Sequence, residues 1–282
     1  MMRHAALVML GLARAAPLAA QVPPGLAAER AGFTAWLTSA PNSPYAAIYH
    51  QPLAGELVFG PGGDPALLAL PRAVLTERGG ALRLRTAEGE RAAPRHRDVP
   101  FGNWRLRVSG ERGRRTVTVF GPVRGARPPA YHPYDRARVV EGTLEPAARA
   151  EERRMLGLDG IEVTATLAGT FIGRLDGAAI RLTVYRMPEP GGEEAELMIF
   201  FRDGTNGVTT YPAGRFLAVE PLPGGRYRAD FNRARNPFCA YNGVFPCPLP
   251  WPGNAIAARI EAGERYAGTG ARAGAPAPGA RP

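Results

Sequence analysis

Apolar residues follow a helical period only near the start of the chain and a period of two afterwards. From Pro23 to Leu37, apolar side chains that include Phe33 and Trp36 can share one side of a helix. Pro41 and Pro44 end this pattern, because proline cannot continue a helix and disfavours helical geometry in the residue before it. The pattern therefore predicts one helix, close to the N-terminus.

Beyond the helix, short alternating runs separated by glycine and proline are typical of an antiparallel β region. The clearest pair is Trp104–Ser109 and Thr116–Phe120, which are joined across Gly110–Gly113 as in a hairpin, with glycine suited to the turn. These runs predict a small antiparallel sheet or sandwich. The expected strands are 46–49, 56–59, 73–76, 81–86, 104–109 and 116–120.

A proline-rich stretch at 122–133 separates this region from a second series of strands. We expect a strand at 138–144, a short charged helix at 146–156, and then six strands. Leu197–Phe201 is continuously apolar, which predicts a strand covered on both faces. The series predicts an antiparallel β-meander, either barrel-like or a sandwich. The six expected strands are 161–167, 170–174, 179–186, 196–201, 214–220 and 227–232.

The two ends of the chain differ from this mainly β body, which we divide into an N-terminal helix and small β region at 21–125 and a C-terminal β-meander domain at 126–266. Residues 1–20 have a short basic start, a short apolar run and small residues, as in a signal peptide; the alternative is an uncleaved helix. The apolar run is too short for a transmembrane anchor. We therefore expect a periplasmic or secreted protein, and a disordered tail at 267–282.

The formal net charge of +10 comes from arginine, since all 35 basic residues are arginine and none is lysine. This bias indicates GC-rich coding more than selection for phosphate binding, and we expect no nucleic-acid partner. Between Arg72 and Arg127, fourteen arginines and five acids give 14 − 5 = +9. The arginines alternate with apolar residues there, which fits either the solvated face of a sheet or a surface that meets an anionic envelope partner.

The sequence lacks the residues that several classes of catalytic or binding site require. The serines after residue 20 are Ser39, Ser43 and Ser109, and none lies in a G-x-S-x-G turn. The three histidines after residue 20, at positions 50, 96 and 132, form no zinc motif, and phosphate-binding and dinucleotide fingerprints are missing. We therefore expect no metal and no cofactor.

Cys239 and Cys247 flank Asn242-Gly243, a dipeptide that favours a tight reversal. In an exported protein such a pair is expected to oxidise, and a disulfide across so short a loop stabilises by roughly 2–3 kcal/mol. The alternatives are two free buried thiols, or redox or metal chemistry.

Polar residues concentrate between residues 200 and 264. Arg215 can pair with Asp230 if the strand register allows it, and turn amides near Asp203 can hold its carboxylate or an anionic ligand. Such a cluster is either a structural polar network or a ligand or active site. The candidate ligand-binding residues are Asp203, Thr205, Tyr211, Arg215, Asp230, Asn232, Asn236 and Asn254. The candidate catalytic residues are Asp203, Asp230 and Glu264.

The same region carries a family resemblance, strongest over 196–266. The matching residues are Asp203, Thr205, Gly207, Thr210-Tyr211, Gly214-Arg215, Asp230-Phe231-Asn232, Ala234, Asn236-Pro237, Cys239-Ala240, Cys247-Pro248-Leu249-Pro250, Asn254 and Ala262-Gly263-Glu264. This run resembles bacterial domain-of-unknown-function family 1684. Phe238 stands where the family has a second proline, and Trp251 is inserted before Pro252. The family has no assigned reaction, so the resemblance implies a region of interest and no role.

Two classes of function fit these observations. The first is an exported, non-catalytic module that binds a small polar or anionic ligand or an envelope surface. The second is a hydrolase that uses two carboxylates, chosen from Asp203, Asp230 and Glu264, for acid–base work.

Overall fold

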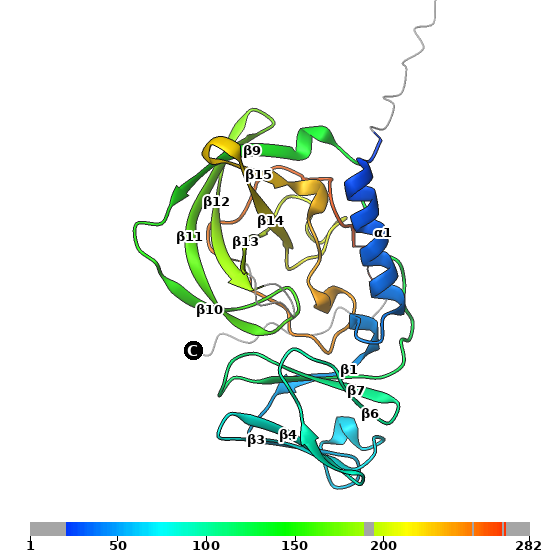
Figure 1. Cartoon of the computed structure of the whole chain (residues 1–282). Helices are drawn as coiled ribbons and strands as arrows, with labels where there is room; N and C mark the ends of the chain where they lie inside the picture. Colours follow the sequence, from blue (N-terminus) through cyan, green and yellow to red (C-terminus); the bar gives the residue numbers. More distant parts are fainter. Residues whose placement is uncertain (1–20, 189–194, 250, 267, 269–282) are drawn as a thin grey trace, which may run out of the picture.

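The computed structural model describes residues 21–188, 195–249, 251–266 and 268. The expected signal peptide, at 1–20, lies outside the described residues, as does the expected tail apart from Gly268. The fold is mainly β, as predicted. Two small sheets lie against one end of a barrel, and the one α-helix of the described residues runs along the barrel's side (Figure 1).

The helix α1 spans Pro24–Ser39 and ends just before Pro41, which confirms the predicted helix. Its contact with the barrel part of the chain is both polar and aromatic. The Arg30 guanidinium donates to the Asn232 carbonyl at 2.9 Å, and the Trp36 and Phe238 ring centroids lie 5.7 Å apart. The helix therefore positions aromatic side chains against the barrel.

The two small sheets form the predicted sandwich. Leu75 and Leu84 of the outer sheet pack against Leu106 and Val117 of the inner sheet in one buried cluster. The inner sheet has the order β1 (Ala47–Pro52), β8 (Thr116–Phe120), β7 (Trp104–Ser109), β6 (Val99–Phe101). The outer sheet has the order β2 (Glu56–Phe59), β3 (Ala73–Arg78), β4 (Ala81–Thr86), β5 (Gly89–Ala92).

Alternation along β7 and β8 gives the inner sheet two different faces. Leu106 and Val117 face the outer sheet, whereas Arg107, Ser109 and Thr118 lie on the opposite face. Ser109 and Thr118 are buried, so the interpretation of this alternating run as a solvated face is wrong for β7. The polar face of the inner sheet is covered by the rest of the molecule.

The second half of the chain is a closed antiparallel barrel of six strands. Its core takes one or more buried apolar side chains from every strand, for example Phe171, Leu182 and Leu217. The ring closes because β9 pairs with both β15 and β11. β10 (Glu152–Leu156) pairs with the first part of β11, on the same edge of that strand as β9. The barrel strands are β9 (Val139–Pro146), β11 (Glu162–Leu175), β12 (Ala178–Pro188), β13 (Ala195–Phe201), β14 (Arg215–Leu222) and β15 (Arg226–Asp230).

Three sequence expectations for this half have clear outcomes. The helix at 146–156 is wrong, because Pro146 ends β9 and residues 152–156 form β10. The two strands at 161–167 and 170–174 are one strand, β11, with a register shift at Gly169. The strand covered on both faces is confirmed, since Phe201 points into the barrel core and Phe200 packs outside it.

A third buried cluster joins the two halves of the molecule. It brings Phe120 of β8 together with Phe216 of β14 and with Phe238, Phe245 and Trp251 from the segment after β15. The N-terminal sandwich and the barrel therefore share a core, and the boundary between them is not a linker between separate bodies.

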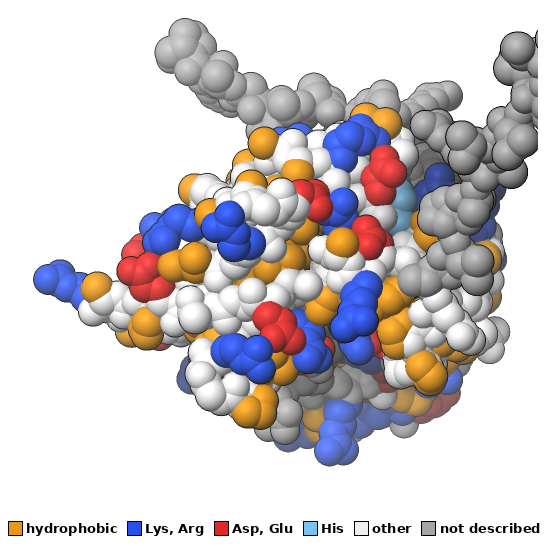
Figure 2. Space-filling model, turned by 90° about the horizontal axis from the view of Figure 1, so that it is seen from above, with side chains coloured by type: hydrophobic (Ala, Val, Ile, Leu, Met, Phe, Trp, Pro, Cys, Tyr) orange, Lys and Arg blue, Asp and Glu red, His pale blue; other side chains and the backbone are white. Residues whose placement is uncertain are grey.

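The upper end of the molecule has mixed charge. Arginine and acidic side chains are interspersed over the face seen from above (Figure 2). Barrel strands and the turns beside them contribute ion pairs of this kind, such as Arg226–Glu141 at 2.7 Å and Arg138–Asp176 at 2.6 Å. Among the described residues, no helix has the length and apolar character needed to cross a bilayer.

Candidate functional site

Most of the polar residues singled out in the sequence connect distant segments of the chain. Arg215 is fully buried, and its Nη2 lies 2.8 Å from Asp203 Oδ2 and 3.0 Å from the Ile260 carbonyl oxygen. Its Nη1 donates to the carbonyl of Ala262. Asp203 Oδ1 in turn accepts from the backbone amide and the hydroxyl of Thr205. The ion pair thus fastens the C-terminal segment to β14 and has no opening for a ligand.

The expected pairing of Arg215 with Asp230 is wrong. Ala229 pairs with Val219, which places Asp230 opposite Ala218, three residues along β14 from Arg215. Asp230 instead accepts from the Asn232 amide at 3.0 Å and closes the turn that follows β15.

The three predicted asparagines bind backbone groups. Asn232 exchanges two hydrogen bonds with the backbone of Asp135, both at 2.9 Å. Asn254 binds the amide and carbonyl of Thr183, and Asn236 donates to the Arg265 carbonyl. Each amide therefore ties a loop to a distant segment, which is a structural role.

Glu264 lies in a closed site of its own. Its carboxylate accepts from the Asn236 amide at 2.9 Å and from the Tyr241 hydroxyl. Complete burial raises the pKa of Glu264 to about 7, against the opposing effect of these donors and of the Arg235 charge. Asp203, Asp230 and Glu264 have separate sets of partners, and none of them lines a larger cavity in the described part of the chain.

The expected disulfide is absent, because Cys239 and Cys247 are free thiols. Both sulfurs contact the Tyr211 hydroxyl, at 3.3 and 3.2 Å. The thiol of Cys239 lowers the pKa of Cys247 to about 6, and the pKa of Cys239 is raised. The predicted reversal does not form: Asn242 donates to the Pro44 and Ala47 carbonyls, and neither Asn242 nor Gly243 has the positive φ that it requires.

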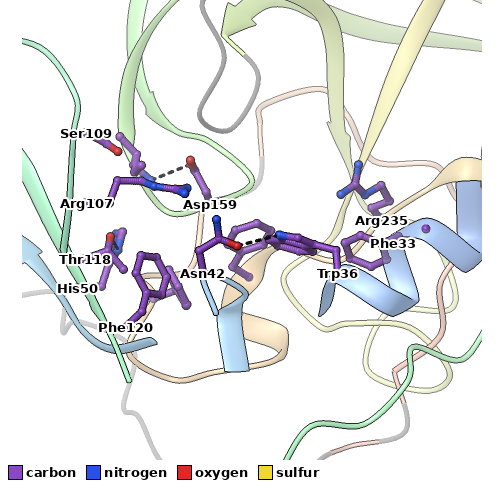
Figure 3. Close-up of a pocket in the computed structure, with 14 residues that line it drawn as sticks. Phe33, Trp36, Asn42, His50, Arg107, Ser109, Thr118, Phe120, Asp159 and Arg235 are labelled. Atoms are coloured by element: carbon purple, nitrogen blue, oxygen red, sulfur yellow. Dashed lines mark hydrogen bonds between the residues drawn. The ribbon is translucent and has the colours of Figure 1, made fainter. Parts of the chain in front are cut away.

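A cavity of about 440 Å³ lies where α1, the inner sheet and the barrel loops meet (Figure 3). Its polar wall is the covered face of the inner sheet. The strand register places His50 of β1, Thr118 of β8 and Arg107 of β7 in one row, and Ser109 follows two residues further along β7. The alternating pattern of β7 and β8 thus builds one wall of the site.

His50 is held as a neutral imidazole. Its Nδ1 lies 2.9 Å from the Thr118 hydroxyl oxygen, and its Nε2 lies 3.3 Å from the Gly160 carbonyl oxygen. Since a carbonyl can only accept, Nε2 carries the proton and Nδ1 accepts from Thr118. Both ring nitrogens are therefore engaged. Burial also lowers the pKa of His50, so the ring is uncharged near neutral pH.

Asp159 reaches the cavity from the tight loop between β10 and β11. Its Oδ1 accepts from the Ile161 amide at 3.1 Å. Burial raises the pKa of Asp159 to about 6, and the positive charge of Arg107 acts in the opposite direction. The Ser109 hydroxyl lines the same cavity and, within the described part of the chain, is buried without a hydrogen-bond partner.

Arg107 is already paired. Its guanidinium lies 2.7 Å from Asp98, whose other carboxylate oxygen accepts from Asn42. Asn42 in turn accepts from the indole of Trp36 at 3.3 Å. This chain of contacts links the inner sheet to α1 and fixes one side of the cavity.

Arg235 is different, because its guanidinium has no ion pair among the described residues. It stacks over the Phe33 ring, with Cζ 4.5 Å from the centroid, and its buried Nε has no hydrogen-bond partner there. The backbone of Arg235 is fixed by two hydrogen bonds with Phe216, at 2.8 and 2.9 Å. Figure 3 shows Arg235 and Phe33 at one end of the site and Asp159 with Ser109 at the other.

Sequence reasoning missed this cavity. Two of its residues belong to scarce types, since His50 and Ser109 are among the few histidines and serines after residue 20. Their convergence with Arg235 depends on contacts between positions far apart in the chain, and local pattern carries no signal for it.

Comparison with known proteins agrees with the resemblance seen in the sequence. Residues 129–265 match the family described as "Protein of unknown function (DUF1684)". This segment belongs to that family. The family segment begins before β9 and ends just after Glu264, so it contains the whole barrel and both cysteines, whereas α1 and the sandwich precede it.

A solved structure is also similar to this chain. It is the NMR structure of an uncharacterized protein of Haloarcula marismortui, 34% identical, which covers 49% of this chain and 75% of that one with a TM-score of 0.42. No curated protein matches.

Proposed function

We propose that this protein is an exported, non-catalytic binding protein whose cavity holds a small organic ligand with an anionic group and an apolar body. The carrying observation is the Arg235 guanidinium, which has no ion-pair partner among the described residues and lies in a cavity of about 440 Å³ with aromatic walls. The proposal moves the ligand site away from the Asp203–Arg215 cluster.

Charge supports an anionic ligand. The Arg235 guanidinium is half-buried, and apart from its stacking on Phe33 it has no ion pair among the described residues to offset its desolvation. A carboxylate or phosphate fits the planar donors of arginine and forms charge-assisted hydrogen bonds. Arg107 already has Asp98, which leaves Arg235 as the cation available in this cavity.

The aromatic walls of the cavity indicate a ligand with an apolar body. Rings from α1, β8 and the segment after β15 surround the space, and a cavity of this size is in the range used for small molecules. The aromatic lining residues are Phe33, Trp36, Phe120, Phe238 and Phe245.

The arrangement favours binding over catalysis. A serine nucleophile needs a base within hydrogen-bond reach, but both ring nitrogens of His50 are occupied by Thr118 and Gly160. A hydrolase that pairs two carboxylates has less support, because Asp203, Asp230 and Glu264 are each enclosed by other partners.

Two further parts of the proposal rest on the sequence. The proposal of export is supported by the signal-like residues 1–20. Contact with an anionic envelope surface is supported by Arg83 and Arg85, which are exposed on the outer sheet.

Matched ligands test the binding proposal. Octanoate and phenylacetate should raise the melting temperature and bind in calorimetry, whereas octanamide and phenylacetamide should bind at least about tenfold more weakly, because an ion pair with Arg235 contributes roughly 1.5–3 kcal/mol. Arg235→Gln should remove the preference for the acids. Arg226→Gln changes an exposed arginine of β15 and is the matched control. Equal binding of acids and amides by the wild-type protein would refute the proposal.

A further inference from the structure

The end of the cavity opposite Arg235 also has unused polar groups. Asp159 lines this end and accepts from the Ile161 amide through Oδ1, and no arginine forms an ion pair with its carboxylate within the described part of the chain. The fully buried Ser109 hydroxyl lines the same cavity and has no hydrogen-bond partner there. Both groups accept hydrogen bonds, which suits a ligand group rich in donors.

The charges near Asp159 do not neutralise it. Arg107 makes its ion pair with Asp98, at 2.7 Å, and makes none with Asp159. His50 is buried with both nitrogens engaged, and burial lowers its pKa, so it contributes no positive charge near neutral pH. With a pKa of about 6, Asp159 is ionised in most molecules at pH 7.5.

We infer that this end of the cavity is a second recognition site, for the ammonium group of a ligand whose carboxylate binds Arg235. This inference rests on the proposed function and narrows its ligand class to a zwitterion. An ammonium group has three donors and no acceptor, which matches Asp159 Oδ2 and the Ser109 oxygen.

The position of the two ends sets the spacing of the ligand charges. Asn42 and Trp36 lie between the Asp159 end and the Arg235 end (Figure 3). A free α-amino acid carries both charges on one carbon and cannot reach both ends. The ligand class is therefore an amino acid with its two charges separated by an apolar spacer, found either in an ω-amino acid or in a short peptide with free termini.

A metal ion suits this end less well. Among the described residues, no group of three or more histidine, cysteine or acidic side chains is arranged to hold one. The single carboxylate of Asp159 and the engaged His50 supply too few ligands for a closed site.

Pairs of compounds that differ only in the amine test the inference at pH 7.5. The first pair is 8-aminooctanoate and octanoate; the second is the dipeptide Ala-Phe and its N-acetyl form, which distinguishes a peptide source from an ω-amino acid. We expect the free amine to increase affinity at least tenfold in one pair or both. If the amine adds nothing or weakens binding in both, the inference is wrong.

Single substitutions show which residues produce the preference for the amine. Asp159→Asn keeps the oxygen that accepts from the Ile161 amide, so it should fold, bind octanoate as the wild type does, and lose the preference for the amine. Ser109→Ala should reduce amine binding by a few fold and leave octanoate unchanged. Asp176→Asn, at an exposed carboxylate of the β11–β12 hairpin, is the matched control. An undiminished preference in both Asp159→Asn and Ser109→Ala would overturn the inference.

The results separate the two proposals. Binding of octanoate without any gain from the amine would leave the anionic-ligand proposal standing and remove this inference. Failure of every carboxylate to bind the wild-type protein would remove the proposed function, and the inference with it.

Discussion

At the scale of single residues, burial alone does not identify a functional group in this protein. Arg215 and Asp203 are fully buried, yet every partner they have is part of the chain, and their pair holds segments together. Arg235 and Ser109 line one cavity, and each has a buried polar atom there without a partner in the described residues. Unmet hydrogen-bonding capacity in a cavity is the more informative sign of a ligand site.

Glu264 gives a prediction about pH. Its pKa rises from 4.5 in the unfolded chain to about 7 in the folded protein, so the folded state holds this proton more tightly. The stabilisation from this group is fully present below pH 4.5 and is lost as the pH rises through 7, an amount of about 3 kcal/mol. Glu264→Gln removes that dependence. The free energy of unfolding of the wild type minus that of the variant should therefore be about 3 kcal/mol more positive at pH 4.5 than at pH 8.

Urea denaturation between pH 4.5 and pH 8 measures this difference. Subtracting the variant from the wild type cancels the contributions of other groups that titrate in this range, such as Asp159. Glu145→Gln, at an exposed carboxylate, is the control. A wild-type and Glu264→Gln difference that is constant across the range would show that Glu264 is not the group responsible.

Sequence reasoning identified some of these residues. It grouped Asp203, Arg215 and Asp230 in one polar cluster, either structural or functional, but it paired Arg215 with the wrong carboxylate, because the turn between β14 and β15 leaves the register open. The loop that holds the free thiols of Cys239 and Cys247 also makes distant contacts, since Asn242 donates to the carbonyls of Pro44 and Ala47.

At the scale of elements, strands were predicted well where alternation was clear and poorly where charges interrupted it. The hairpin β7–β8 is as expected, because alternation and turn glycines agree. The charged run at 146–156 was assigned to a helix, but it contains the end of β9 and the strand β10, whose pairing with β11 overrides local preference. The described part of the final segment, 231–249 and 251–266, has few regular elements and is held by side chains and by scattered backbone hydrogen bonds.

The Arg215–Asp203 pair is the main side-chain connection between β14 and that final segment. Arg215→Met leaves the buried Asp203 carboxylate without its counter-ion and should reduce the free energy of unfolding by roughly 3–5 kcal/mol. Arg226→Met removes an exposed pair with Glu141 and should cost at most about 1 kcal/mol. Urea denaturation at pH 7 compares the two, and similar losses would contradict the structural role given to Arg215.

At the scale of the whole molecule, the cavity exists only because the two halves share a core. The sandwich supplies its polar wall, α1 supplies Phe33 and Trp36, and the segment after β15 supplies Arg235. Sequence reasoning divided the chain at the proline-rich stretch and so had no way to predict a site between the parts. The family segment begins near that division, which places α1 and the sandwich wall outside the part of the chain that matches.

A shared core predicts that both halves unfold together. Phe245 packs against Phe238, with centroids 5.5 Å apart, and against His50 of the sandwich, at 4.8 Å. Phe245→Ala opens a void there and should lower the free energy of unfolding by about 3–5 kcal/mol. Amide hydrogen exchange measures this change separately in Val117–Val119 of the sandwich and in Ile199–Phe201 of the barrel. Both segments should lose the same amount of unfolding free energy, because opening either half exposes the other. A loss confined to one half would show that the sandwich and the barrel are independent units.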